Sequence, residues 1–166
     1  MKLRGIVPPL VTPMGENGGF DESGMERLVA HVTSAPVSGL FVLGTTGEGP
    51  SLDYQTRKDV IRTTSRLKPV ETPLLVSVTD TSLVEMQALS DFAAAEGADY
   101  LVVAPPYYLT PGEARNPPLA RFSRSQPASA LFCLQYARHD QGGSHLEGSI
   151  APPEIHQLPG IQGQLS

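Results

Sequence analysis

The stretch Phe41-Val42-Leu43-Gly44-Thr45-Thr46-Gly47-Glu48-Gly49 joins an apolar run to a polar turn that is rich in glycine. Residues 40–43 are all hydrophobic, which predicts a strand that is buried on both faces. Gly44 and Gly47 favour a sharp turn with consecutive backbone N–H groups exposed, a small nest for a carboxylate or a phosphate. Parallel α/β folds place their sites at the ends of such strands. The stretch therefore predicts a parallel α/β fold with an anion site.

The same turn has a simpler interpretation. Thr45 and Thr46 would then only hydrogen-bond to their own backbone in an ordinary connection between a strand and a helix. In the functional interpretation, the two hydroxyls donate to the bound anion or relay a proton. The turn alone leaves both interpretations open.

Outward from this turn, apolar runs alternate with helical patterns. Strands are expected to start near residues 6, 39, 73 and 100, at intervals of roughly 30 residues. The intervening helices are expected after the capping residues Asp21 and Ser23, over residues 54–67 after Asp53, and over residues 83–96 before Gly97. This alternation predicts right-handed βαβ units and a parallel sheet.

Eight such units would form a (β/α)8 TIM barrel of about 250 residues. A chain of 166 residues accommodates only the N-terminal half to two-thirds of that barrel. The pattern is clear over residues 1–112, which we interpret as the N-terminal βα units. It decays over residues 113–166, where only residues 130–134 suggest a fifth strand.

Composition narrows the class of protein. A net charge of −5 argues against a nucleic-acid surface, and no apolar run approaches the roughly 20 residues of a membrane helix. The single cysteine, Cys133, excludes an internal disulfide and provides no metal cluster. We therefore expect a cytoplasmic protein.

Residues 5–13, residues 39–48, Gly97-Ala98-Asp99 and Pro106-Tyr107-Tyr108, in this order and spacing, resemble the dihydrodipicolinate synthase / N-acetylneuraminate lyase family. Its members are pyruvate-dependent class I aldolases built on a (β/α)8 barrel. The resemblance implies a lysine that forms a Schiff base with pyruvate and an enamine that attacks an aldehyde. It implies no cofactor, and a homo-oligomer for the full-length enzyme.

The resemblance also implies roles for the hydroxyl groups of the turn. Thr45 matches the family's proton-relaying threonine. Thr45 and Thr46, together with Gly47, match the turn that holds the pyruvate carboxylate.

Three tyrosines are implied as well. Tyr108 matches the catalytic tyrosine that in many members reaches into a neighbouring subunit's site, and Tyr107 beside it is a candidate substrate-binding residue. Tyr136 lies where the family has a further catalytic tyrosine in the pattern Tyr-Asn-x-Pro, which this chain lacks. Tyr107 and Tyr108 have an alternative interpretation as an aromatic pair that packs at the barrel mouth.

The implied Schiff-base lysine is missing from its expected place. Residues 158–163 resemble the approach to it, but the position two residues later is Leu165. The lysines present are Lys2, Lys58 and Lys68. Lys2 precedes the first predicted strand, Lys58 lies on a predicted helix, and Lys68 follows that helix on the side opposite the carboxyl ends of the strands. We therefore expect the chain to lack its amine nucleophile.

A shift of reading frame would explain this departure. Residues 134–142 can be encoded by CTA CAA TAT GCC CGG CAT GAC CAA GGT G, which one nucleotide later reads Tyr-Asn-Met-Pro-Gly-Met-Thr-Lys-Val. We hypothesise that the chain is out of frame from about Arg115 to beyond Gly143, that the family-like frame returns around Leu158, and that it is lost again before a truncated end.

The sequence thus favours a pyruvate-dependent Schiff-base aldolase or lyase of the 4-hydroxy-tetrahydrodipicolinate synthase type, inactive as written. Aspartate semialdehyde is the first choice of aldehyde and a sugar-acid aldehyde the second. The alternative is a non-catalytic half-barrel or pseudoenzyme that at most binds a small carboxylate. A nucleotide-binding P-loop is disfavoured because no Lys-Ser/Thr follows residues 44–49.

Overall fold

The computed structural model describes residues 3–104 and 130–133 of the chain. The elements follow one another as α1 (Glu22–Thr33), β1 (Leu40–Val42), the short 3₁₀ helix η1 (Gly49–Ser51), α2 (Tyr54–Leu67), β2 (Leu74–Ser77), α3 (Leu83–Ala95), β3 (Tyr100–Val103) and β4 (Ala130–Cys133). Helices and strands therefore alternate as the sequence predicts.

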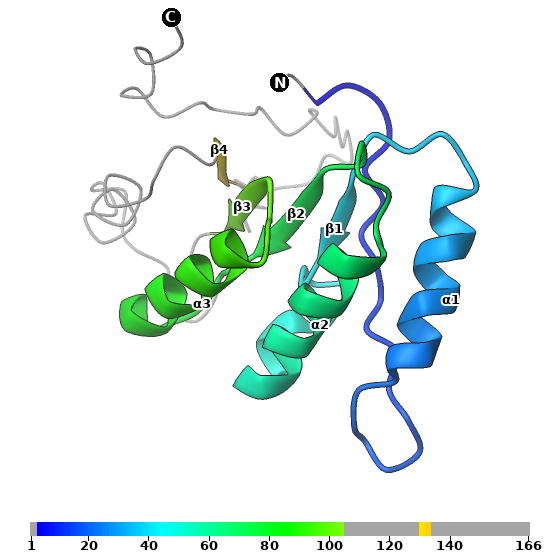
Figure 1. The fold of residues 1–166 in the computed structure, drawn as a ribbon. Helices are drawn as coiled ribbons and strands as arrows, with labels where there is room; N and C mark the ends of the chain where they lie inside the picture. Colours follow the sequence, from blue (N-terminus) through cyan, green and yellow to red (C-terminus); the bar gives the residue numbers. More distant parts are fainter. Residues whose placement is uncertain (1–2, 105–129, 134–166) are drawn as a thin grey trace, which may run out of the picture.

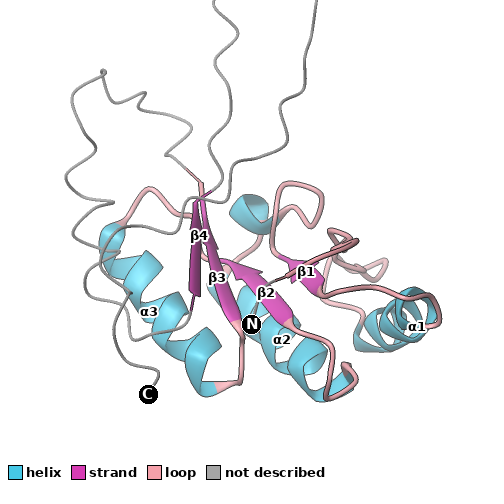
Figure 2. Ribbon diagram, turned by 90° about the horizontal axis from the view of Figure 1, so that it is seen from above, coloured by secondary structure: helices cyan, strands magenta, loops and turns pink. Residues whose placement is uncertain are grey.

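The four strands form one parallel sheet in the order β1-β2-β3-β4. Figure 1 shows α2 and α3 side by side on one face of this sheet, with α1 beyond α2. The view from above in Figure 2 shows the strands fanning out with these helices on the same side. The parallel sheet is thus confirmed, and β4 confirms a strand where the fifth was expected. All carboxyl ends of the strands meet at one edge.

The strands are apolar on both faces, as parallel strands are when both faces are covered. Leu40, Val42, Val76 and Leu101 belong to the main core, which the three helices cover. The alternate positions form a second cluster on the other face, made by Leu75, Tyr100 and Val102 with Leu3, Val7 and Phe41 packed against them. This second face corresponds to the inside of the predicted barrel.

Side-chain caps define where the helices begin. The Asp53 carboxylate accepts from Thr56 N–H at 3.0 Å, and Ser82 Oγ accepts from Glu85 N–H at 3.4 Å. Asp21 caps α1 by accepting from Gly24 N–H at 2.9 Å, whereas Ser23 lies inside the helix. At the other end of α3, Gly97 has a φ of +89°, which glycine adopts without strain and which ends the helix.

The first predicted strand is irregular. Phe41 N–H donates to Pro8 O at 3.1 Å, and Leu10 N–H donates to Phe41 O at 2.8 Å, so the segment runs parallel to β1. Proline has no N–H to donate, and pairing is limited to the single bridge between Pro9 and Phe41. The segment therefore closes the β1 side of the sheet without becoming a regular strand.

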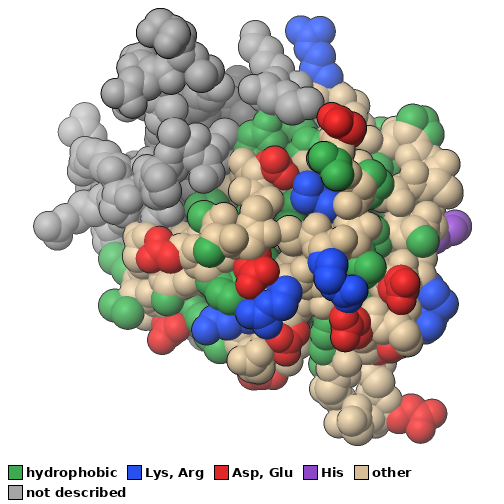
Figure 3. All heavy atoms as spheres, viewed as in Figure 1, with side chains coloured by type: hydrophobic (Ala, Val, Ile, Leu, Met, Phe, Trp, Pro, Cys, Tyr) green, Lys and Arg blue, Asp and Glu red, His purple; other side chains and the backbone are tan. Residues whose placement is uncertain are grey.

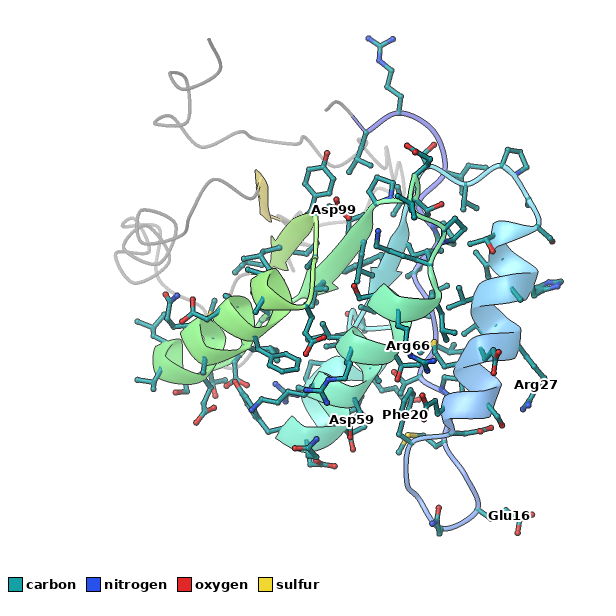
Figure 4. All side chains as sticks on the ribbon, viewed as in Figure 1. Glu16, Phe20, Arg27, Asp59, Arg66 and Asp99 are labelled. Carbon is teal, nitrogen blue, oxygen red and sulfur yellow. The ribbon has the colours of Figure 1, made fainter. Side chains whose placement is uncertain are left out.

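Charges of both signs are interspersed over the helices on the face drawn in Figure 3. Figure 4 labels Arg66 on the side of α2 that faces α1, and this arginine pairs with Glu22 of α1. Exposed pairs of this kind contribute little to stability. Within residues 3–104 and 130–133, no helix has the length and apolarity needed to cross a membrane.

The cap of α2 is directly testable. Asp53→Ala removes an acceptor for both Thr56 N–H (3.0 Å) and Thr56 Oγ1 (2.6 Å), so we expect it to lower the free energy of unfolding by about 1 kcal/mol. Asp91→Ala is the control, because Asp91 lies within α3 and accepts an exposed hydrogen bond from Gln87 at 2.8 Å. Urea unfolding followed by circular dichroism measures both variants. Equal losses would contradict the capping role.

Candidate functional site

The chain reverses direction immediately after β1, through residues 44–49, which we call the hydroxyl turn. Leu43 and Glu48 have φ values of +59° and +53°, in the left-handed region that side chains other than glycine rarely adopt. Glu48 N–H donates to Thr45 O at 3.1 Å, and Gly49 N–H donates to Gly44 O at 3.3 Å. The strained residue Leu43 therefore ends β1 one residue earlier than expected, and the turn folds back on itself.

The glycines of this turn lie where the backbone packs too closely for a side chain. Neither Gly44 nor Gly47 has a positive φ. A Cβ atom at Gly44 would lie 2.8 Å from the Phe41 ring, and one at Gly47 would lie 2.8 Å from Leu10 O. A Cβ at Gly49 would collide with the Leu43 carbonyl oxygen. The sharp turn predicted at these glycines is present, and the glycines are required there by close packing of the backbone.

The two threonines lie on the open side of the turn. Thr45 and Thr46 are exposed, while Gly47 is buried beneath them. Their backbone N–H groups donate to no other residue within 3–104 and 130–133. From below, Thr12 Oγ1 donates to Gly47 O at 2.7 Å and holds the turn against the first segment. The turn therefore presents hydroxyls and adjacent N–H groups, a combination suited to a carboxylate.

The carboxyl ends of the neighbouring strands carry further polar groups. Ala104 N–H donates to Thr79 Oγ1 at 2.9 Å, which ties the end of β3 to the end of β2. Ser77 Oγ lies 3.3 Å from the same Thr79 hydroxyl oxygen. Over the described ranges 3–104 and 130–133, no three His, Cys, Asp or Glu side chains are grouped closely enough to hold a metal ion. Hydroxyl groups thus dominate this part of the edge.

A buried ion pair lies beside the hydroxyl turn. Arg57 Nη1 is 2.9 Å from Asp80 Oδ2, and these side chains are only 9% and 17% exposed. Burial alone would raise the pKa of the Asp80 carboxyl, but a hydrogen bond from Ser82 N–H and the Arg57 guanidinium hold that pKa below its usual value. In the sequence, Arg57, Lys58, Arg62 and Arg66 together suggest a charged face for the helix over residues 54–67. Arg62 and Arg66 are exposed, but Arg57 is buried.

Lys58 and Lys68 both lie away from the hydroxyl turn. Lys68 Nζ is 3.7 Å from Asp99 Oδ2, and the same Asp99 oxygen accepts from Leu74 N–H at the start of β2. Figure 4 labels Asp99 where the strands begin, at the edge opposite the turn. Lys58 Nζ lies 5.4 Å from the centre of the Phe92 ring on α3. The predicted place of Lys68, opposite the strand ends, is confirmed.

The predicted tyrosines Tyr107, Tyr108 and Tyr136 lie outside the described residues, as do Lys2 and nearly all of residues 113–166. Their assigned roles and the proposed frame shift therefore stay predictions. The structure places Thr45, Thr46 and Gly47 together in one turn.

Two residues at the site escaped the sequence reasoning. Arg57 occupies the same helical face as Val60, Ile61 and Thr64, at spacings of three, four and seven residues, and all of these are buried. That spacing would have identified Arg57 as an interior residue. Thr12 donates to Gly47 O, and the sequence gives only one sign of this role, which is that Thr12 lies at the end of the first segment.

The close packing at Gly49 predicts that a methyl group there disrupts the turn. Gly49→Ala forces the backbone away from Leu43 O, and overpacking of this kind costs about 1–3 kcal/mol. Gly19→Ala is the matched control, because its Cβ would meet only the Asn17 side chain, at 3.3 Å. Unfolding in urea compares the two variants, and a Gly49→Ala protein as stable as Gly19→Ala would refute the packing argument.

The lowered pKa of Asp80 predicts a pH-dependent contribution to stability. A carboxyl whose pKa is lower in the folded state stabilises the fold above its unfolded pKa of about 4, and this contribution disappears as the pH falls through the folded value. The difference in unfolding free energy between wild type and Asp80→Asn should therefore be largest near neutral pH and shrink below about pH 4. A difference independent of pH would contradict this assignment.

The sequence comparisons agree with the geometry. The Dihydrodipicolinate synthetase family matches residues 2–116. The 4-hydroxy-tetrahydrodipicolinate synthase of Salinibacter ruber is 35% identical over 114 residues, which make up 69% of this chain and 38% of that protein. An uncharacterized DapA-like lyase of Thermococcus onnurineus is 38% identical over 106 residues, 64% of this chain and 36% of the lyase. The chain thus spans little more than a third of the length of these relatives.

Solved structures are similar over a larger part of the chain. The dihydrodipicolinate synthase of Bacteroides thetaiotaomicron has 42% identity and a TM-score of 0.70, covering 79% of this chain and 44% of that enzyme. YagE of E. coli, solved in complex with pyruvate, has 32% identity and a TM-score of 0.69, and the match covers 80% of this chain and 44% of YagE. The N-acetylneuraminate lyase of Mycoplasma synoviae has 21% identity and a TM-score of 0.70. The match covers 81% of this chain and 46% of the lyase and shows that the two share the fold.

These relatives are TIM barrels, and the four parallel strands with their helices match less than half of each. The chain therefore belongs to the dihydrodipicolinate synthetase family and carries the N-terminal part of its (β/α)8 barrel.

Proposed function

We propose that the hydroxyl turn binds the carboxylate of pyruvate, as part of a pyruvate-dependent Schiff-base aldolase of the 4-hydroxy-tetrahydrodipicolinate synthase type. The observation that carries this proposal is the exposure of Thr45 and Thr46 at the carboxyl end of β1, with backbone N–H groups beside them that donate to no other described residue. The likeness to YagE, which was solved with pyruvate, supports the choice of ligand.

In this proposal the residues of the turn orient the substrate. The hydroxyls and N–H groups of Thr45 and Thr46 donate to the two carboxylate oxygens, which leaves the keto carbon free to face an amine. Thr45 Oγ1 then relays a proton, with Tyr108 and Tyr136 as its partners. Aspartate semialdehyde is the proposed aldehyde, a sugar-acid aldehyde is the second choice, and a homo-oligomer is proposed for the full-length enzyme.

The positions of Lys58 and Lys68 favour a second candidate, a non-catalytic half-barrel or pseudoenzyme that at most binds a small carboxylate without forming a Schiff base. Lys68 lies beside Asp99 at the opposite edge of the sheet, and Lys58 lies over the rings between α2 and α3. An amine must reach the keto carbon to attack it. Neither lysine is placed to do so from its position in the fold.

Borohydride reduction in the presence of pyruvate separates the two candidates. We expect no covalent pyruvate adduct in the intact mass of this chain, because Lys58 and Lys68 lie away from the turn and Lys2 precedes the first predicted strand in the sequence. A single adduct mapped by peptide sequencing to one lysine would contradict that expectation and favour the enzyme for this very chain. The control omits pyruvate, which corrects for non-specific reduction products.

Pyruvate recognition by the turn is tested separately by amide NMR. We expect saturable shifts at Thr45 and Thr46, and affinity about tenfold weaker in Thr45→Val, because a hydrogen bond to a charged group contributes about 1.5–3 kcal/mol. Thr72→Val, two residues before β2 and on the opposite edge, is the control and should leave the affinity unchanged. Shifts centred elsewhere, or none that saturate, would exclude the turn as the pyruvate site.

A further inference from the structure

Arg57 is a buried cation with three separate acceptors. Its Nε donates to Leu52 O at 3.0 Å, its Nη2 donates to Pro50 O at 3.2 Å, and its Nη1 donates to Asp80 at 2.9 Å. The guanidinium carbon also lies 5.4 Å from the centre of the Tyr54 ring. A buried charge is costly unless it is paired and hydrogen-bonded, and Arg57 meets both conditions.

Two of these acceptors belong to the segment that continues the hydroxyl turn. Pro50 lies in η1, and Leu52 follows it directly. The same segment is bonded back to the turn, because Ser51 N–H donates to Glu48 O at 2.8 Å and Gly49 N–H donates to Gly44 O at 3.3 Å. Arg57 therefore holds the far end of a backbone path that begins at the exposed threonines.

The third acceptor belongs to the connection after the next strand. Asp80 lies between β2 and α3, and its Oδ1 accepts from Ser82 N–H at 3.0 Å. Ser82 is in turn the N-cap of α3. A single guanidinium thus joins the connections that follow β1 and β2 at the carboxyl edge of the sheet.

We propose that Arg57 is a positioning residue that holds the hydroxyl turn in its anion-binding geometry by clamping Pro50, Leu52 and Asp80 together. Arg57 makes its contacts behind the turn, so its effect reaches the ligand through the backbone of residues 44–51. The expected effect of Arg57 on pyruvate affinity rests on the proposed function. The expected effect of Arg57 on the conformation of the turn does not.

The clamp requires the fork of the guanidinium. Arginine offers five N–H donors in a rigid plane, whereas lysine concentrates its charge at one point. Arg57→Lys keeps a positive charge near Asp80, but a single ammonium group cannot replace both hydrogen bonds to the carbonyl groups of Pro50 and Leu52. Arg62→Lys is the matched control, because Arg62 lies on the same helix and pairs with Asp59 and Glu96 while it is 51% exposed.

The test is amide hydrogen exchange of the full chain, read at Glu48 and Gly49, whose N–H groups are hydrogen-bonded inside the turn. We expect Arg57→Lys to speed their exchange about tenfold, with little change at Val76 in β2, since local opening is governed by local bonds. Arg62→Lys should leave all three amides unchanged. Pyruvate affinity should weaken in Arg57→Lys and stay constant in Arg62→Lys.

Several outcomes would overturn the proposal. Exchange at Glu48 and Gly49 within error of wild type would show that Arg57 does not hold the turn. An equal acceleration of exchange at Val76 would assign Arg57 to the general stability of the fold. If Arg57→Lys does not fold, Asp80→Asn takes its place in the same experiment. Exchange at Glu48 and Gly49 that is not selectively faster in Asp80→Asn would then overturn the clamp. A wild-type chain that ignores pyruvate would refute the proposed function alone, because the exchange experiment still decides the clamp.

Discussion

The close approach of Gly49 to the carbonyl of Leu43 is the constraint on which the site depends. There is no space for a side chain between them, so the backbone after β1 must double back within six residues, 44–49. The reversal places Gly47 beneath the surface and leaves Thr45 and Thr46 above it.

The rest of the described fold restrains this turn from three directions. Thr12 holds it from the first segment, Arg57 holds its continuation from α2, and Leu43 joins it to the buried strand β1. The strands below are apolar on both faces, so they provide a rigid base with few polar groups of their own. The exposed polar groups are therefore concentrated in one short, restrained loop on a packed scaffold, which is the usual arrangement of binding loops.

The helices and the sheet could be predicted from the sequence because their signals are local. Asp53 caps α2 where a cap was expected, and the predicted residues 54–67 coincide with the helix. Lys68 was placed correctly because it follows that helix directly. The left-handed conformation of Leu43 could not be predicted, since it is imposed by contacts with Gly49 rather than by its own preference.

Arg57 illustrates the limit of reasoning from residue type. Its charge suggested solvent, whereas its spacing from Val60 and Ile61 places it in the interior. The acceptors that make burial tolerable come from Pro50 and Asp80, which no local pattern connects to it. For Tyr107, Tyr108 and Tyr136, the family resemblance alone supports their roles.

The prolines of the first segment have a consequence for self-association. Pro8 O and Leu10 N–H point toward β1, so the intervening Pro9 directs its backbone away from the sheet. At that position an incoming strand from another molecule would find a carbonyl and no N–H donor. Proteins use proline in this way to discourage edge-to-edge aggregation. The residues that make this segment irregular thus also protect the sheet at its β1 side.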